Sequence, residues 1–168
     1  MIEIRRASAQ DAHLVTQTRR IVWDETYRGI YPDEMIDCYD YDRRYALDFA
    51  LIASDDHRYY LFMDGDICAG YMSFGPYNYG TYKDFDLCLN NLYFRKSYQG
   101  KGLGKQALRI LHSYAADYGF SKFFCGCNLH NTNAQGFYRH LGGVPGEISS
   151  GAGNKSDDII FFEFYLGE

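Results

Sequence analysis

The sequence predicts an α+β fold in which helices flank a mixed β-sheet. Segments that alternate apolar and polar residues as strands do are interleaved with segments of helical periodicity along all 168 residues, as expected of a sheet covered by helices. Hydrophobic residues make up 46% of the chain and aromatic residues 18%, a composition typical of a packed globular protein. The length suits one domain over residues 1–168, and we find no linker or internal repeat.

The first part of the chain predicts a strand followed by helices. Residues 2–5 alternate apolar and charged side chains, as a short strand does. Ser8 is positioned to cap a helix over residues 9–27, which Gly29 and Pro32 would end. Two further helical segments follow, residues 33–37 and residues 41–53.

The middle of the chain predicts a β-hairpin and a long central strand. Residues 58–63 and 67–74 are rich in β-forming side chains, and the Asp-Gly turn at residues 64–66 joins them. A Gly- and Asn-containing loop then leads to a strand over residues 85–94, whose alternation is interrupted by two asparagines at residues 90–91.

The last part predicts two helices and two strands. Residues 103–118 place apolar side chains on one helical face, and residues 133–141 form a shorter helix stopped by two glycines. Residues 122–128 and 159–166 read as strands. The apolar final strand and the abundant tyrosines are compatible with a homodimer and equally with a core.

The charge is acidic overall, but one stretch is basic. A formal net charge of -5 argues against a general nucleic-acid binder, because a phosphate backbone requires a basic surface. Residues 87–116 nevertheless contain no Asp or Glu. The basic residues of this stretch are Arg95, Lys96, Lys101, Lys105 and Arg109. A basic island in an acidic chain predicts a small polyanionic ligand.

Cysteine and hydropathy patterns predict a cytoplasmic protein without a metal. Its cysteines are Cys38, Cys68, Cys88, Cys125 and Cys127, an odd number that favours reduced thiols over a disulfide framework. No histidine pair has the spacing of a zinc site. We expect no membrane contact, because no apolar run is long enough to cross a bilayer and the first ten residues lack the apolar stretch of a secretory signal.

The most informative segment is a glycine-rich turn between a predicted strand and a predicted helix. It reads Gln99-Gly100-Lys101-Gly102-Leu103-Gly104-Lys105. Alternate glycines let the backbone turn sharply and approach a ligand closely, while free amides and the dipole at the helix start attract an anion. Nearby Lys and Arg side chains add positive charge, so the turn predicts a phosphate-binding site.

Other interpretations of these glycines differ in how well they fit. A Walker phosphate loop requires Ser or Thr after its Gly-Lys pair, but Gln106 follows Lys105. A dinucleotide fingerprint requires glycine where Lys105 stands. A turn with no ligand remains the simplest alternative.

Two motifs in this chain resemble those of the GCN5-related N-acetyltransferase (GNAT) family. Its acetyl-CoA loop reads Gln or Arg, two residues, Gly, one residue, then Gly or Ala, and Gln99, Gly102 and Gly104 match it. The residues that match its second motif are Asn131, Ala134, Phe137, Tyr138 and Gly142. The resemblance covers essentially the whole chain, and it implies a mostly antiparallel sheet.

The resemblance implies a function and a set of site residues. The protein would transfer an acetyl group from acetyl-CoA to an amine, with Tyr138 protonating the departing thiolate as general acid. The segment from Leu92 to Phe94 would lie along the pantetheine arm as an added strand does, and Asn131 would hydrogen-bond it. The cofactor-binding residues so implied are Leu92, Tyr93, Phe94, Gln99, Gly100, Lys101, Gly102, Leu103, Gly104, Lys105 and Asn131. The alternatives are that Tyr138 is a core aromatic and Asn131 only a helix cap.

The chain departs from the family pattern in two places. Lys96 stands where a proline is common after the central strand, and Gly143 stands where an aromatic residue often follows the motif glycine. The first change would alter the strand exit and add charge. The second would remove a packing group near the cofactor helix.

The acceptor side is less defined by the sequence. Residues 23–32 mix aromatic and acidic side chains and resemble the acceptor-side helix and loop of the family. We therefore expect a small cationic amine that packs against Tyr27 or Tyr31, although these tyrosines are equally suited to the core. The general base remains open; its candidates are Asp86, Glu25 and His130.

Direct attack by the amine is the expected route. No sequence neighbour of Cys125 or Cys127 would activate a thiolate, so a covalent cysteine intermediate is disfavoured. Two other functions are compatible with the same fold: acetylation of a protein or peptide, and a non-catalytic acyl-CoA sensor.

Overall fold

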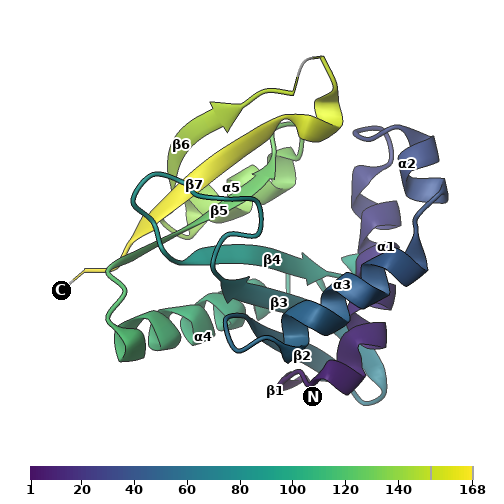
Figure 1. Ribbon diagram of the computed structural model, residues 1–168, viewed down its shortest axis with the longest axis horizontal. Helices are drawn as coiled ribbons and strands as arrows, with labels where there is room; N and C mark the ends of the chain where they lie inside the picture. Colours follow the sequence, from purple (N-terminus) through teal and green to yellow (C-terminus); the bar gives the residue numbers. More distant parts are fainter. Residues whose placement is uncertain (152, 168) are drawn as a thin grey trace.

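The computed structural model describes residues 1–151 and 153–167 and contains one seven-stranded sheet in the order β1-β2-β3-β4-β5-β7-β6 (Figure 1). Its strands are β1 (Glu3–Arg6), β2 (Arg58–Asp64), β3 (Ile67–Gly75), β4 (Cys88–Phe94), β5 (Lys122–Asn128), β6 (Val144–Ser149) and β7 (Ile159–Tyr165). Its helices are α1 (Ala12–Tyr27), α2 (Asp33–Asp37), α3 (Tyr41–Ala53), α4 (Leu103–Tyr118) and α5 (Thr132–His140). Only β4 and β5 pair in parallel among these strands, which confirms the mixed, mostly antiparallel sheet.

Three elements differ from the sequence-based prediction. Residues 9–11 form a 3₁₀ turn ahead of α1, where an Asp11 oxygen accepts the Ser8 amide at 2.8 Å. The central strand begins at Cys88, because the Phe85 amide donates to the Tyr82 carbonyl at 3.1 Å in the turn before it. Strand β6 was not predicted, since its sequence VPGEIS combines proline, glycine and polar residues and lacks a clear strand pattern.

Helices cover both faces of the sheet. On one face, Leu108 and Leu111 of α4 belong to the same buried cluster as Phe62 of β2. On the other face, Val15 of α1 packs with Leu61, the neighbour of Phe62 in β2. Successive residues of β2 therefore serve two cores, as the period-two pattern of a strand requires. Burying each such side chain contributes about 1.5–3 kcal/mol.

The final strand, β7, lies between β5 and β6 inside the sheet. Its residues from Ile160 to Phe164 are buried, so its apolar character serves the core.

Among the described residues, no helix is both long and apolar enough to span a bilayer. In the same part of the chain, no group of three or more His, Cys, Asp or Glu side chains is arranged to hold a metal ion.

A buried carboxylate anchors the loop that precedes β4. The oxygens of Glu163 on β7 accept hydrogen bonds from Tyr82 at 2.8 Å, Lys83 at 2.5 Å and Tyr165 at 2.6 Å. The rings of Tyr82 and Phe85 pack with Phe124 of β5 over the same region. Glu163 thus holds a loop of distant sequence against the sheet.

We predict that this anchor makes stability depend on pH. The Lys83 and Tyr165 hydrogen bonds lower the pKa of Glu163 from 4.5 to about 2. Its stabilisation should therefore be fully present above pH 4.5 and be lost as the pH falls toward 2. At pH 7, Glu163→Gln should lower the free energy of unfolding, because Lys83 loses its ion-pair partner. We expect a loss of only about 1–2 kcal/mol, since Lys83 is partly exposed and solvent screens the pair.

Urea unfolding at several pH values measures this effect. Glu147→Gln is the matched control, because Glu147 is exposed and lies 4.0 Å from Lys83; it should change the free energy by less than about 0.5 kcal/mol. A Glu163→Gln effect of the same size at pH 3 and pH 7 would contradict the prediction.

Candidate active site

The two central strands part in the middle of the sheet. β4 and β5 pair only at Cys88 with Phe124 and at Leu89 with Cys125, and beyond this point β5 turns away from β4 (Figure 1). The β3–β4 register skips Asn90, which forms a bulge. In the described part of the chain, the edge of β4 that faces β5 therefore has no strand partner after Leu89.

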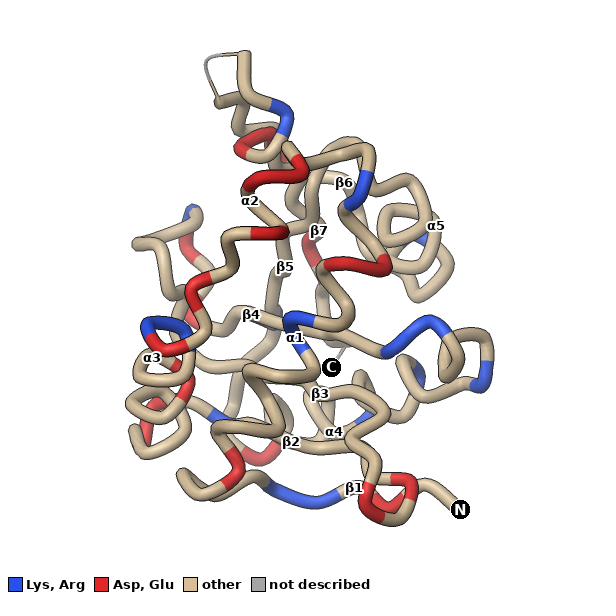
Figure 2. Tube along the Cα trace, turned by 90° about the vertical axis from the view of Figure 1, so that its right-hand side faces the viewer, with Lys and Arg blue, Asp and Glu red and all other residues tan. Residues whose placement is uncertain are grey.

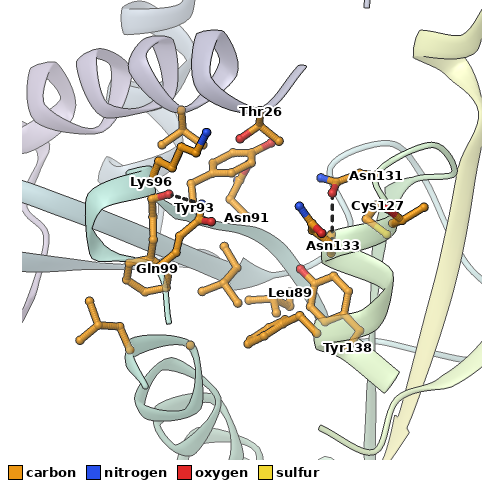
Figure 3. Close-up of a pocket in the computed structure, with 18 of the residues that line it drawn as sticks. Thr26, Leu89, Asn91, Tyr93, Lys96, Gln99, Cys127, Asn131, Asn133 and Tyr138 are labelled. Atoms are coloured by element: carbon orange, nitrogen blue, oxygen red, sulfur yellow. Dashed lines mark hydrogen bonds between the residues drawn. The ribbon is translucent and has the colours of Figure 1, made fainter. Parts of the chain in front are cut away.

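A cavity of about 740 Å³ lies at this opening. Its walls come from α1, β4, β5, α5 and the glycine turn, and Figure 3 shows their side chains around one space. The sequence-predicted site residues in these walls are Tyr27, Leu92, Tyr93, Phe94, Gln99, Gly100, Gly102, Leu103, Gly104, Lys105, Asn131 and Tyr138. The fold thus brings together the two motifs that the sequence analysis identified separately.

Two predicted site residues lie outside these walls. The ammonium of Lys101 is 4.8 Å from the centre of the Tyr98 ring. Tyr31 stacks on Tyr27 with ring centres 4.4 Å apart and lines a neighbouring cavity of about 430 Å³. Ile30 contributes to both cavities, so Tyr31 lies beside the main cavity.

The glycine turn presents open backbone to the cavity. Gly100 and Gly102 have φ of 72° and 77°, a region that favours glycine. No atom lies within 4 Å of where a Cβ would stand at either residue. Since the amides at the start of α4 have no intrahelical acceptor, this surface suits an anionic group.

Gly104 has a different role from the other two glycines. A Cβ there would lie 2.5 Å from the Phe137 ring, so the absence of a side chain lets α5 pack closely against the start of α4.

Figure 2 shows Lys and Arg positions on the projecting chain between β4 and α4, away from the acidic positions of α2. The positive charge is therefore concentrated beside the turn.

The structure explains both departures from the family pattern. The Lys96 amide donates a hydrogen bond to Glu25 of α1 at 2.7 Å, which a proline has no N–H to make. At Gly143, a Cβ would lie 2.8 Å from the Phe164 ring and 2.9 Å from the Tyr138 carbonyl oxygen. Phe164 therefore occupies the space beside Gly143 that an added side chain would need.

Tyr138 combines a buried ring with access to the cavity. Its side chain is 7% exposed, and its hydroxyl points toward the cavity in Figure 3. Burial raises the pKa of this phenol well above its usual value, so the hydroxyl remains protonated at neutral pH. Asn131 caps the same helix, accepting the Ala134 amide at 3.1 Å.

The two cysteines of β5 have unreactive thiols. Burial raises the pKa of Cys127, which lines the cavity, to about 12. Burial also raises the pKa of the Cys125 thiol well above its usual range. Because the thiolate is the nucleophilic form, neither cysteine is activated for acyl transfer at neutral pH.

The three candidate bases lie in different settings. Glu25 and His130 line the cavity, whereas Asp86 does not. His130 Nε2 lies 2.9 Å from an oxygen of Asp158, a contact that the sequence analysis missed. These residues are 28 positions apart, and no local pattern marks such a pair.

The sequence matches the acetyltransferase (GNAT) family over residues 15–142. This match covers most of the chain, so the protein belongs to that family. The family prediction made from the two motifs is confirmed.

Individual relatives agree with this assignment. An uncharacterized N-acetyltransferase in the pepI 3' region of Lactobacillus delbrueckii subsp. lactis is 32% identical over 87 residues, which are 50% of this chain and 49% of that protein. The match thus spans about half the length of this curated relative. The PaiA N-acetyltransferase of Thermoplasma acidophilum, solved in complex with coenzyme A, is 20% identical to this chain. The two structures align with a TM-score of 0.75 over 99% of each chain.

A third relative is YncA of Salmonella typhimurium, solved with its cofactor acetyl-CoA. It is 24% identical, with a TM-score of 0.70, and the comparison covers 99% of this chain and 95% of that one. At these identities the structures establish a common fold. Their bound ligands agree with the cofactor predicted from the sequence.

We predict that the capping role of Asn131 can be measured separately from ligand contact. Asn131→Ala should lower the free energy of unfolding by about 1 kcal/mol, because α5 loses its N-cap hydrogen bond. Asn133→Ala is the control, since Asn133 also lines the cavity but is exposed. Thermal unfolding without ligand compares the two, and equal effects would show that the cap contributes nothing.

Proposed function

We propose that this enzyme transfers an acetyl group from acetyl-CoA to the primary amine of a small cationic molecule by direct attack. The observation that supports this most strongly is the single cavity connecting the glycine turn with Tyr138 and Tyr27. One ligand can therefore reach both the anion-binding turn and the buried phenol.

The cysteines and the sheet support two further parts of the proposal. The five cysteines are free, which supports a cytoplasmic location. The single sheet shared by all strands supports one domain over residues 1–168.

The cavity walls fit coenzyme A in two respects. The amides around Gly100 and Gly102 would hold the pyrophosphate, with Lys105 adding positive charge within the wall and Lys101 acting from the surface. The free edge of β4 from Leu92 to Phe94 would hydrogen-bond the pantetheine as a neighbouring strand would. Gln99 supports this edge, since its side-chain amide donates to the Phe94 carbonyl at 3.0 Å.

The proposed chemistry assigns separate roles to the cofactor and to the chain. Acetyl-CoA supplies the activated thioester. Tyr138 would donate its proton to the leaving sulfur, since burial keeps the phenol protonated. The high pKa of Cys127 argues against an acetyl-cysteine route and so supports direct transfer.

Aromatic rings support the choice of a cationic acceptor. Tyr27 forms T-shaped contacts with Trp23 and stacks on Tyr31, so its ring is held in place at the end of α1. The faces of such rings attract an ammonium group, and the predominantly acidic surface favours cation approach.

We predict that a panel of acceptors will show this preference. Thiol release from acetyl-CoA should be fastest with spermidine or kanamycin, with kcat/KM at least about tenfold above alanine or a neutral peptide, because opposite charges attract across the cavity mouth. Turnover with only anionic or apolar acceptors would remove the cationic assignment. Faster turnover of the peptide would favour a protein substrate, and coenzyme A binding without any turnover would favour a sensor.

We predict a selective kinetic defect in Tyr138→Phe. This variant should lower kcat about 10²-fold, because it loses the proposed proton donor, and change the Kd of coenzyme A by less than about threefold. Tyr118→Phe is the control, because Tyr118 is exposed on α4 outside the cavity. Calorimetry and steady-state kinetics measure the two quantities, and an unchanged kcat would exclude the acid role.

A further inference from the structure

We propose that His130 is the general base of the reaction and that Asp158 positions its ring. This inference rests on the proposed function, which requires that the ammonium group of the acceptor lose a proton before it attacks. The geometry distinguishes His130 from the other two candidate bases, Glu25 and Asp86. Asp158 is 28 residues from His130 in the sequence, and the fold brings the two side chains together.

The location of His130 favours it over Glu25. His130 lies in the cavity wall immediately before Asn131, on the side of the opening formed by β5 and α5. Glu25 is bonded to the amide of Lys96, three residues before Gln99, so its carboxylate lies toward the proposed pyrophosphate end. Asp86 is outside the cavity.

The contact with Asp158 fixes both the tautomer and the orientation of the His130 ring. Nε2 of His130 is 2.9 Å from Oδ2 of Asp158, and a carboxylate can only accept a hydrogen bond. Nε2 therefore carries a proton, and in the neutral ring Nδ1 has the lone pair that a base needs. No other hydrogen bond to the His130 ring occurs within residues 1–151 and 153–167.

The backbone on both sides of this pair is also fixed. The other Asp158 oxygen accepts the Gly151 amide at 3.2 Å, and the Asp158 carbonyl accepts the Leu129 amide at 2.8 Å. The His130 amide donates to the side chain of Asn128 at 2.9 Å. The end of β5 and the start of β7 thus hold the Asp158 carboxylate and the His130 imidazole in fixed positions, which limits the movement of the base.

The proposed proton transfers balance with Tyr138 as the acid. His130 Nδ1 takes one proton from the acceptor ammonium, and the freed nitrogen lone pair forms the C–N bond to the acetyl carbon. The C–S bond breaks, its electron pair goes to sulfur, and Tyr138 protonates that sulfur. The second proton on nitrogen leaves as the amide forms and restores the Tyr138 hydroxyl. The His130 ring, whose side chain is 36% exposed, releases its proton to water.

Substitution and chemical rescue test the assignment. His130→Gln and His130→Ala should lower kcat with spermidine, or with the panel amine that the unaltered enzyme acetylates fastest, by about 10²-fold or more. Added imidazole should restore at least about tenfold of the His130→Ala rate, because it replaces the missing base within the space vacated. His13→Gln, exposed on α1, is the control and should keep the full rate with no response to imidazole.

A second nucleophile separates a base from a structural residue. Hydroxylamine is neutral at pH 7 and needs no proton removed before attack, so His130→Gln should reduce its acetylation far less than that of the protonated amine. Asp158→Asn should give an intermediate loss of kcat with the protonated amine, because the ring remains but loses its carboxylate partner.

The outcomes distinguish this inference from the function on which it rests. If the unaltered enzyme acetylates an amine but imidazole fails to rescue His130→Ala, or both nucleophiles lose rate equally in His130→Gln, His130 is not the base. If the unaltered enzyme acetylates no amine in the panel, the proposed function fails and the base assignment fails with it.

Discussion

The separation of β4 from β5 beyond Leu89 is the constraint on which the site depends. Two parallel strands would normally satisfy each other's backbone groups along their length, but here the pairing stops after two residue pairs. The remaining β4 edge therefore keeps unused hydrogen-bonding capacity beside an open cavity. Side chains then add to this edge from three elements, namely α1, the glycine turn and α5.

A strand with one free edge needs support from elsewhere, and a buried polar network supplies it. The side-chain amide of Asn91 donates to Ser73 on β3 at 2.6 Å and accepts from Arg19 on α1 at 3.1 Å. Arg19 is 5% exposed, and it forms an ion pair with fully buried Asp48 of α3. Because unpaired buried charges are costly, this network strongly favours one arrangement of α1, α3 and β4.

The sequence predicts those parts of the site that depend on local chemistry. Gly100 and Gly102 require a particular backbone conformation and open space around it, and that requirement appears directly in their residue type. The interruption at Asn90 likewise marks the bulge in β4. These patterns depend on neighbouring residues only, so they can be recognised without knowledge of the tertiary structure.

The parts that the sequence could not predict join distant segments. Glu25 and Lys96 are 71 residues apart, and their hydrogen bond uses a backbone N–H that a proline at residue 96 would lack. Asp158 reaches His130 only because β5 and β7 pair side by side. Neither contact leaves a periodic pattern, since each joins two single residues near the ends of elements.

The same topology separates the electrostatic tasks of the two ends of the cavity. The amides that we propose to bind the pyrophosphate and Lys105 lie where the chain enters α4, while His130 and Asp158 lie where β5 and β7 meet. A cluster of lysines beside the acceptor would repel a cationic amine, whereas lysines beside the pyrophosphate would attract it. The divergence of β4 and β5 keeps these two groups of charges on different elements, so each can favour its own ligand within one continuous cavity.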